Sequence, residues 1–566
     1  MSLYFDAVAI LTAPSSGGSF KSRIYSARNL RASPAQIYAL TTEAAKWDTV
    51  LADVIDKSGI LALERKLSPL LALLLVHDHL LAKKGIAAPA THTLRQAVER
   101  HKARLKAEFT KARVRYGCAT VQEFKAAVIR EKRVADGTSH FVYPRWVRIN
   151  NIRTTLEEQL DTTFKAYRRV EMLAELATEE ERKPEPRLFI DPNIPDLVAV
   201  PFGADFTSSA AYKNGEIILQ DKASCFPAYL LLGDRGADDA WEGDLVDGCA
   251  APGNKTTHLA SLLAKQQKGK AEKSDQMIYS MDASTMRSKT LQKMVGLAGA
   301  DSVTVLQGQD FLALDTEEER FANVTGLLLD PSCSGSGIIG RDDVPQFTLP
   351  TSQSKGPKSH GKKRKREDEE AIESKATPGT AQAAPTDEND IADGVDPERL
   401  TKLSSIQARI VEHALSFPNA THVTYSTCSI HLIENEGVVE RILKTKVAKE
   451  RGWRLLRRDE QPDGLRRWSK RGVREEKPAE GETGPSGSVK LSDEALEACI
   501  RSWQGDAEGL GGFFVAGFVR DPTLATAAPV ETEDENEDDE VVETATAEDE
   551  YEDEDEDEED WGGFSD

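Results

Sequence analysis

Short apolar runs alternate with amphipathic stretches from about residue 215 to residue 522, and this alternation constrains the fold more than any other feature. The apolar runs include DLVDGCA, MIYSMD, SVTVLQ, VTGLLLD, THVTYST and GFFVAGFVR, and stretches with helical spacing such as NKTTHLASLLAKQ lie between them. Strands that are apolar on both sides belong to a mostly parallel sheet with helices on both faces. The sequence therefore predicts an α/β domain over 215–522, with ligands bound at the carboxyl ends of its strands.

Two smaller regions precede this domain. Residues 1–140 are expected to form a helical N-terminal domain, because Ala, Leu, Lys, Glu and Arg dominate at helical spacing between about 33 and 135. Residues 141–214 are expected to form a small subdomain and a linker. The run WVRIN predicts a strand, Thr154 and Thr155 are candidate caps of a helix that starts near Leu156, and the charged segment TEEERKPEPR predicts the linker.

Two segments are too polar to bury a core. Residues 350–395 are rich in Ser, Lys, Glu, Thr, Ala and Pro and are predicted to form a disordered insert. Residues 523–566 are predicted to form a disordered acidic tail.

The negative net charge is concentrated in that tail. The full chain of 566 residues has a formal charge of −23, and residues 531–566 contribute 22 Asp and Glu without Lys or Arg, which leaves −1 for the rest. Residues 95–153 carry 15 Lys and Arg against 5 Asp and Glu. Solvated helix faces would explain this excess, and phosphate contacts, with Arg145 and Arg148 as candidates, are the alternative.

The six cysteines do not form a disulfide framework, and none of them shows the CxxC spacing of a zinc site, so no metal is expected. Cys118, Cys225 and Cys499 are expected to be inert core residues. The N-terminus lacks the pattern of a signal peptide, and the most apolar stretch, around 70–76, is too short to span a bilayer. These features favour a reducing compartment and no membrane partner.

The loop DGCAAPGNKTTHLA, which begins at Asp247, follows the first strand of the predicted sheet. Gly253 allows a tight turn, and a helix that begins near Asn254 would direct backbone N–H groups at a ligand. Asp282 ends the second strand, where an acid suits ribose hydroxyls, and Asp310 follows the third, near an adenine edge. The alternative is that these acids only cap the helices that follow, but together they favour a nucleoside site.

Two cysteines lie at the ends of the next two strands. Asp330 and Cys333 follow the fourth strand in LLLDPSCSGSG, and Cys428 follows the fifth in THVTYSTCS. Because the carboxyl ends of neighbouring parallel strands converge, both thiols are expected to border one pocket. Cys249, in the loop after the first strand, is expected to pack rather than react.

Three motifs resemble those of the Sun/RsmB (NOL/NOP/Sun) family of RNA cytosine-C5 methyltransferases. In chain order they are CAAPGNKTTHLA, DPSCSGSG and YSTCSIHLIENE, and the resemblance covers roughly residues 143–520. The segment PRWVRIN resembles the start of the family's small RNA-recognition subdomain. The segment LQDKASCFPA, with CAAPGNK, is most similar to the eukaryotic branch that acts on large-subunit (25S/28S) rRNA.

The resemblance implies a Rossmann-like S-adenosylmethionine-dependent methyltransferase sheet and an enzyme that methylates carbon 5 of a cytosine in RNA. It makes Cys428 the nucleophile, Cys333 the residue needed for product release, and Lys255 and Asp330 the groups near the cytosine. The residues that it places against the cofactor are Cys249, Ala250, Ala251, Pro252, Gly253, Asn254, Lys255, Asp282, Arg287, Asp310 and Asp330.

The reaction explains why such an enzyme needs a thiol. Carbon 5 of cytosine does not attack a sulfonium methyl group unaided, but a thiolate that adds to carbon 6 moves electron density onto carbon 5. A free thiol has a pKa of about 8.5, so the site must favour the thiolate. Asp330 at N3 and N4 of the base would take up the developing charge, and Cys333 is suited to remove the proton from carbon 5.

Other methyltransferase classes fit less well. A DNA cytosine-C5 enzyme would carry its nucleophile in a Pro-Cys pair on the fourth strand, whereas Ser332 precedes Cys333 here. An amino-group methyltransferase would have an Asp/Asn-Pro-Pro-aromatic loop at Asp330. Two alternatives stay open, a ribosome-assembly factor that binds RNA and in which methylation is secondary, and a tRNA cytosine-C5 methyltransferase.

The expected partner is RNA, as large-subunit rRNA or a pre-ribosome, and neither DNA nor a membrane. The acidic tail is expected either to contact basic ribosomal proteins or to screen off weak RNA partners. The run GKKRKRE at 361–367 predicts nuclear import, and therefore residence in the nucleus and nucleolus.

Overall fold

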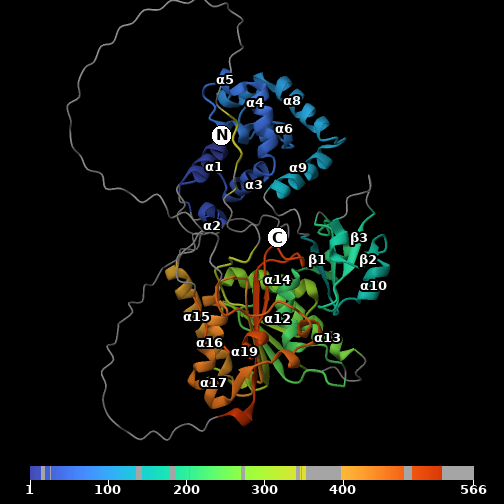
Figure 1. Cartoon of the computed structure of the whole chain (residues 1–566), viewed down its shortest axis with the longest axis vertical. Helices are drawn as coiled ribbons and strands as arrows, with labels where there is room; N and C mark the ends of the chain where they lie inside the picture. Colours follow the sequence, from blue (N-terminus) through green and yellow to red (C-terminus); the bar gives the residue numbers. More distant parts are fainter. Residues whose placement is uncertain are drawn as a thin grey trace, which may run out of the picture. The chain divides into compact units, whose positions relative to one another are not determined.

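The computed structural model describes residues 1–13, 20–25, 27, 29–135, 143–177, 185–202, 204–236, 238–268, 275–338, 345, 347–351, 397–476 and 487–525. These residues fall into two compact units, one made of 1–141 with 334–400 and the other of 142–333 with 401–566 (Figure 1). The predicted disordered insert from residue 352 onward, its basic run, and all but the first residues of the acidic tail lie outside the described residues.

The first unit is helical, as the spacing predicts, but its helices begin earlier than residue 33. Its core is apolar and includes five consecutive, wholly buried residues from Ala72 to Val76, so this apolar stretch is a core helix. Pro69 and the Ser68 hydroxyl, which accepts from the Leu71 backbone N–H, define where that helix begins. The helices are α1 (Ser2–Thr12), α2 (Phe20–Tyr25), α3 (Pro34–Ala45), α4 (Asp48–Ser58), α5 (Ile60–Leu63), α6 (Pro69–Leu81), α7 (Thr93–Arg100), α8 (Lys102–Arg115) and α9 (Val121–Ala135).

A short segment from the middle of the chain belongs to this helical unit, although the sequence placed it in the α/β domain. Phe347 packs against the helical core, and the Thr348 backbone N–H donates to Asp48 Oδ2 at 2.7 Å. The Thr351 hydroxyl donates to Asp56 Oδ2 at 3.0 Å. This segment therefore groups with the helical unit, which the sequence did not indicate because Phe347 and the few residues described around it show no periodic pattern.

The second unit contains the predicted sheet, in the order β11-β13-β10-β9-β6-β7-β8. Strands β10, β9, β6, β7 and β8 are parallel, and β13 is antiparallel to β10 and β11. The short strand β12 pairs antiparallel with the first residues of β13. The bounds are β6 (Asp244–Asp247), β7 (Ile278–Asp282), β8 (Val303–Gln307), β9 (Val324–Leu329), β10 (His422–Thr427), β11 (Trp453–Leu455), β12 (Ile500–Ser502) and β13 (Phe513–Arg520).

Helices cover both faces of this sheet, and alternate residues of a strand pack against the helices on opposite faces. Leu327 and Leu329 pack in the core with α15 and α16, whereas Leu328 packs in the core with α12, α13 and α14. This double burial explains the continuous apolar runs of the sequence. The helices are α12 (Lys222–Leu232), α13 (Asn254–Gln267), α14 (Thr285–Ala298), α15 (Pro397–Leu415), α16 (Glu436–Lys444), α17 (Lys446–Arg451), α18 (Asp463–Arg466) and α19 (Asp493–Ala498).

A smaller sheet in the order β2-β3-β4-β1-β5 precedes the large one. The predicted strand WVRIN is β1, and Thr155 caps the helix α10 as expected, since its hydroxyl accepts from Glu158 N. Arg187 begins β3, so the segment predicted as a linker ends in a strand. The elements are β1 (Arg145–Ile149), α10 (Leu156–Asp161), β2 (Arg168–Val170), β3 (Arg187–Ile190), β4 (Leu197–Val200), α11 (Ala210–Lys213) and β5 (Ile217–Leu219).

The described residues contain neither a membrane-spanning helix nor a cluster of metal ligands. No helix among them is long and apolar enough to cross a membrane. Within the same ranges, no group of three or more His, Cys, Asp or Glu side chains is arranged to hold a metal ion.

Candidate functional site

The predicted cofactor loop connects β6 to α13 at the carboxyl edge of the sheet. Gly253 has φ of +116°, a conformation that side chains disfavour, and it forms the N-cap of α13. The Ala250 backbone N–H donates to Met281 O at 2.9 Å, which ties the loop to the end of β7. The loop therefore presents the start of α13 beside two strand ends.

The acids at the neighbouring strand ends differ in their contacts. Asp282 is almost wholly buried, accepts from the Ser284 backbone N–H, and pairs with Arg287 at 3.3 Å. Arg287 Nη2 also donates to Ala251 O at 3.0 Å, so it links Asp282 to the predicted cofactor loop. Asp310 caps a short 3-10 turn through Leu312 N, which is the capping role considered from the sequence.

Lys255, the second residue of α13, reaches across to the end of β9. Its Nζ donates to Asp330 Oδ2 at 2.6 Å, and the Ser426 hydroxyl donates to Asp330 Oδ1 at 2.7 Å. Burial alone would lower the pKa of Lys255, but Asp330 and, less strongly, Cys428 outweigh it, and the pKa is raised. Lys255 therefore keeps its positive charge next to both Asp330 and the Cys428 sulfur.

The two cysteines at the ends of β9 and β10 are in contact. Cys333 Sγ and Cys428 Sγ lie 3.1 Å apart, as expected for the ends of two neighbouring parallel strands. The hydrogen bond to Cys428, then burial, and then nearby negative charges raise the pKa of the Cys333 thiol well above its usual value. Either sulfur can be the donor in this contact, and the raised pKa of Cys333 shows that this thiol keeps its proton beside Cys428.

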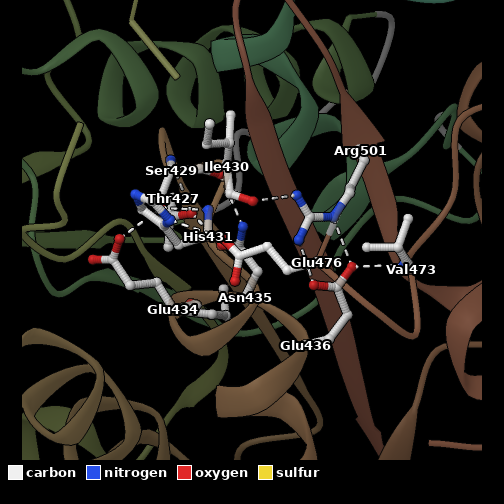
Figure 2. A network of polar contacts seen from close by, with 11 residues as sticks. Thr427, Ser429, Ile430, His431, Glu434, Asn435, Glu436, Val473, Glu476 and Arg501 are labelled. Carbon is white, nitrogen blue, oxygen red and sulfur yellow. Dashed lines mark hydrogen bonds and ion pairs between the residues drawn. The ribbon is translucent and has the colours of Figure 1, made fainter. Parts of the chain in front are cut away.

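A buried polar network supports the turn that carries Cys428 (Figure 2). The Ser429 hydroxyl donates to Glu434 Oε2, and the Thr427 hydroxyl and Asn435 side chain are hydrogen-bonded to each other. Asn435 Nδ2 donates to Ser429 O at 2.8 Å. Arg501 donates to Ile430 O at 3.0 Å and also forms an ion pair with Glu436, so that this ion pair is joined to the turn.

The structure adds Ser426 to the residues that the sequence singled out. Ser426 lies two residues before Cys428, and alternate residues of a strand share a face, so the strand period was a usable signal. The three cysteines that were expected to be inert lie in apolar surroundings. Burial raises the pKa of the Cys225 thiol to about 12 and also raises the pKa of Cys499, while Cys118 packs against the helical core.

Arg148 is not the phosphate contact that its charge suggested. Its side chain is fully buried, where Nε donates to Gln220 Oε1 at 2.6 Å and Nη2 to Thr257 Oγ1 at 2.9 Å. Arg148 therefore ties β1 of the small sheet to α13 of the large one. The sequence pattern could not reveal this, because a buried Arg and an exposed one look alike without their partners.

Three protein-family models match the chain. They describe the N-terminal domain of NOL1/NOP2/Sun domain family member 5 (residues 35–124), the ferredoxin-like domain of the same member (143–220), and the 16S rRNA methyltransferase RsmB/F (238–349). The 25S rRNA (cytosine-C(5))-methyltransferase rcm1 of Schizosaccharomyces pombe is 35% identical over 85% of this chain and 84% of its own length. The chain belongs to the NOL1/NOP2/Sun family of RNA cytosine-C5 methyltransferases.

Other NOL1/NOP2/Sun relatives match along most of the chain. The mouse 28S rRNA (cytosine-C(5))-methyltransferase is 31% identical over 94% of this chain and 93% of its own length. The Arabidopsis thaliana 25S rRNA (cytosine-C(5))-methyltransferase NSUN5 is 30% identical over 77% of this chain and 61% of its own. The predicted family, enzyme class and α/β methyltransferase fold are thus confirmed.

The cofactor of NOL1/NOP2/Sun enzymes is S-adenosylmethionine, and the donors of this site fit it. Asp282, at the end of β7, would hold the ribose hydroxyls, and the backbone N–H groups at the start of α13 would face the ligand. When bound, S-adenosylmethionine supplies an electrophilic methyl group on its sulfonium. The predicted cofactor is therefore consistent with the side chains that the fold brings together.

Proposed function

We propose that this protein transfers a methyl group from S-adenosylmethionine to carbon 5 of a cytosine in large-subunit rRNA. The observation that carries the proposal is the pair of thiols, with their sulfur atoms 3.1 Å apart, beside the ion pair of Lys255 and Asp330. The relatives that match most of the chain are named for 25S and 28S rRNA, which supports the choice of RNA. The roles of individual side chains in binding the cytosine, in attack and in release are part of this proposal.

Cys428 attacks carbon 6 of the cytosine as a thiolate. The Cys333 S–H group and the charge of Lys255 both stabilise negative charge on the Cys428 sulfur. Asp330 is held by Lys255 and Ser426 and faces N3 and N4 of the base, where it fixes the ring. In its protonated form it donates to N3, so that the proton offsets the negative charge that addition of the thiolate to carbon 6 places on the ring.

Cys333 acts after methyl transfer, when carbon 5 must lose its proton and the Cys428–carbon 6 bond must break. The largest cause of the raised Cys333 pKa is its hydrogen bond with Cys428. Once Cys428 is bound to carbon 6 as a thioether, this contact and the charge on Cys428 are lost, and the Cys333 pKa falls. After its own S–H proton has passed to solvent, Cys333 as a thiolate takes the proton from carbon 5, which places its action after methyl transfer.

Replacing each cysteine tests these roles. Cys428→Ala should abolish methylation and any covalent complex, since no nucleophile remains. Cys333→Ala should allow attack and methyl transfer but stop release, so that an enzyme–RNA complex survives denaturing gels and disappears on nuclease treatment. The double variant should give no such complex. A trapped complex in Cys428→Ala and none in Cys333→Ala would reverse the assignment.

The identity of the RNA is tested separately by bisulfite sequencing. Large-subunit rRNA from cells with the gene should contain one or more protected cytosines that are lost when the gene is deleted. Loss of protection in tRNA, with rRNA unchanged, would favour a tRNA enzyme. No change in either RNA would favour an RNA-binding assembly factor.

We also assign the protein to the nucleus and nucleolus, where pre-ribosomes are built. The basic run 361–367 supports import, and a protein with Lys362 to Arg366 replaced by Ala should stay in the cytoplasm by fluorescence microscopy. Normal nuclear entry of that variant would contradict the assignment of the signal. The acidic tail is proposed to contact basic ribosomal proteins, since its 22 acids repel RNA phosphates.

A further inference from the structure

The spacing of the two thiols is not set by the sheet itself. The ladder between β9 and β10 ends at the pair Leu329 and Tyr425. Cys428 lies three residues past this pair and Cys333 four, in loops that are not part of the ladder. Other contacts must therefore hold the two sulfur atoms together.

One side chain, Gln407 of α15, contacts both loops. It is fully buried, and its Nε2 donates to Ser332 O at 3.0 Å and to Glu434 Oε1 at 3.0 Å. Ser332 is the residue before Cys333. Glu434 accepts on its other oxygen from the hydroxyl of Ser429, the residue after Cys428.

The environment of Gln407 fixes the orientation of its amide. A backbone carbonyl and a carboxylate flank one end, and both accept hydrogen bonds, so the nitrogen must lie there. The Tyr425 hydroxyl contacts the other end, Oε1, at 3.2 Å, and Tyr425 belongs to the last ladder pair. The amide thus connects the end of the ladder, the Cys333 loop and the Cys428 turn.

We propose that Gln407 is a positioning residue that sets the sulfur–sulfur distance and thereby the rate at which the covalent intermediate is released. The part of this inference that concerns release rests on the proposed function. Gln407 acts through its hydrogen bonds to Ser332 and Glu434 rather than through contact with the base or the cofactor. Proton transfer to Cys333 depends on its placement, and a displacement of about 1 Å lowers such rates by roughly a hundredfold.

The first experiment follows the covalent complex. Gln407→Met keeps the length of the side chain but donates no hydrogen bonds. With S-adenosylmethionine and substrate RNA, this variant should accumulate a gel-stable complex at least fivefold above wild type. Steady-state kcat should fall tenfold or more, with KM and the first-turnover methylation rate within about threefold of wild type. A purely structural role would lower all rates together without accumulation.

The second experiment measures the spacing without RNA. Diamide takes up two hydrogens and joins two adjacent thiols as a disulfide, which mass analysis of the peptides containing Cys333 and Cys428 detects. Wild type should form this bond quickly, and Gln407→Met at least fivefold more slowly. This result does not depend on the roles of the cysteines in catalysis, so it separates failure of the inference from failure of the proposed function.

The matched control is Ser404→Ala, one turn earlier on α15. Ser404 is also fully buried, but its hydroxyl donates to Thr401 O within its own helix. It should match wild type in both experiments. If Gln407→Met does not fold, Gln407→Asn replaces it, since its amide is one methylene too short to contact both loops, and the same changes are expected. A folded Gln407 variant with wild-type disulfide rate and no accumulation would overturn the proposal.

Discussion

The carboxyl group of Asp247, the last residue of β6, is kept wholly out of water. Its Oδ2 accepts from the Thr256 hydroxyl at 2.7 Å, but burial raises the pKa of Asp247 from 3.8 to about 7. When a carboxyl group has a higher pKa in the folded protein than in the unfolded chain, the free energy of unfolding falls as pH rises from the unfolded-state pKa to the folded-state pKa. Asp247 therefore destabilises the fold increasingly between about pH 4 and pH 7.

Asp247→Asn should remove this penalty. The difference in unfolding free energy, variant minus wild type, should increase by about 3 kcal/mol between pH 5 and pH 8. The increase should level off above the pKa that Asp247 has in the folded protein. Urea unfolding followed by tryptophan fluorescence at several pH values measures the difference. Thr256→Val removes a hydrogen bond that lowers the Asp247 pKa and should extend the window to higher pH. A difference that does not vary with pH would contradict the buried, protonating carboxyl.

Residues were predictable from the sequence where topology alone brings them together. Two neighbouring parallel strands bring the loops of Cys333 and Cys428 to one edge of the sheet, although they do not set the distance between the sulfur atoms, and the position of Lys255 follows from a helix start beside them. Gln407 and Arg148 were not predictable, because their roles depend on tertiary partners. Gln407 lies 21 residues before Cys428 on a helix face that shows no distinguishing pattern.

At the scale of elements, the ion pair between Arg501 of β12 and Glu436 at the start of α16 stands out, since both side chains are wholly buried. Glu436 also accepts from the Val473 backbone N–H at 2.9 Å (Figure 2). Removing one partner of a buried pair leaves an uncompensated charge. Arg501→Met should therefore lower the unfolding free energy by about 3–5 kcal/mol.

The double variant Arg501→Met/Glu436→Leu separates charge from packing. It should recover most of the lost stability in thermal unfolding, because two apolar side chains replace the pair without a stranded charge. Arg458→Met is the control, since its ion pair with Glu497 is solvent-exposed and should contribute less than about 1 kcal/mol. A double variant no more stable than Arg501→Met would indicate that the network needs its hydrogen bonds rather than its charge balance.

Elements were predictable in proportion to their length and periodicity. Strands β6 to β10 and β13 of the large sheet and helices α13 to α15 match the apolar runs and helical stretches of the sequence, whereas the three-residue strand β12 was missed. In the small sheet only β1 was anticipated, because β2 and β5 have three residues each and β3 and β4 have four, too few for an alternation to be recognised. Helix α12 was also missed, since Pro227 lies inside it and its residues are apolar on all sides.

At the scale of the whole molecule, charge is divided between an acidic tail and a basic helical region. Of the basic residues between 95 and 153, Arg148 is buried and Arg115 pairs with Asp53. Lys102 and Lys106 on α8 are exposed to solvent. If the helical unit contributes to RNA binding, these exposed lysines supply the phosphate contacts.

Salt dependence tests this contribution. The logarithm of RNA affinity falls linearly with the logarithm of salt concentration, by about 0.7 for each phosphate contact to single strands. Lys102→Glu/Lys106→Glu should weaken RNA binding and lower this slope by about 1.4, with affinity for S-adenosylmethionine unchanged.

The matched control is Lys444→Glu/Lys446→Glu, which makes the same charge change at the end of α16 and start of α17. These two lysines are also exposed, but each is paired with a glutamate one turn away, Lys444 with Glu440 and Lys446 with Glu450, so this variant should keep the wild-type slope. Equal slopes in filter-binding titrations of all three proteins would show that α8 does not contact RNA phosphates, and equal losses in both variants would show that net charge rather than position governs binding.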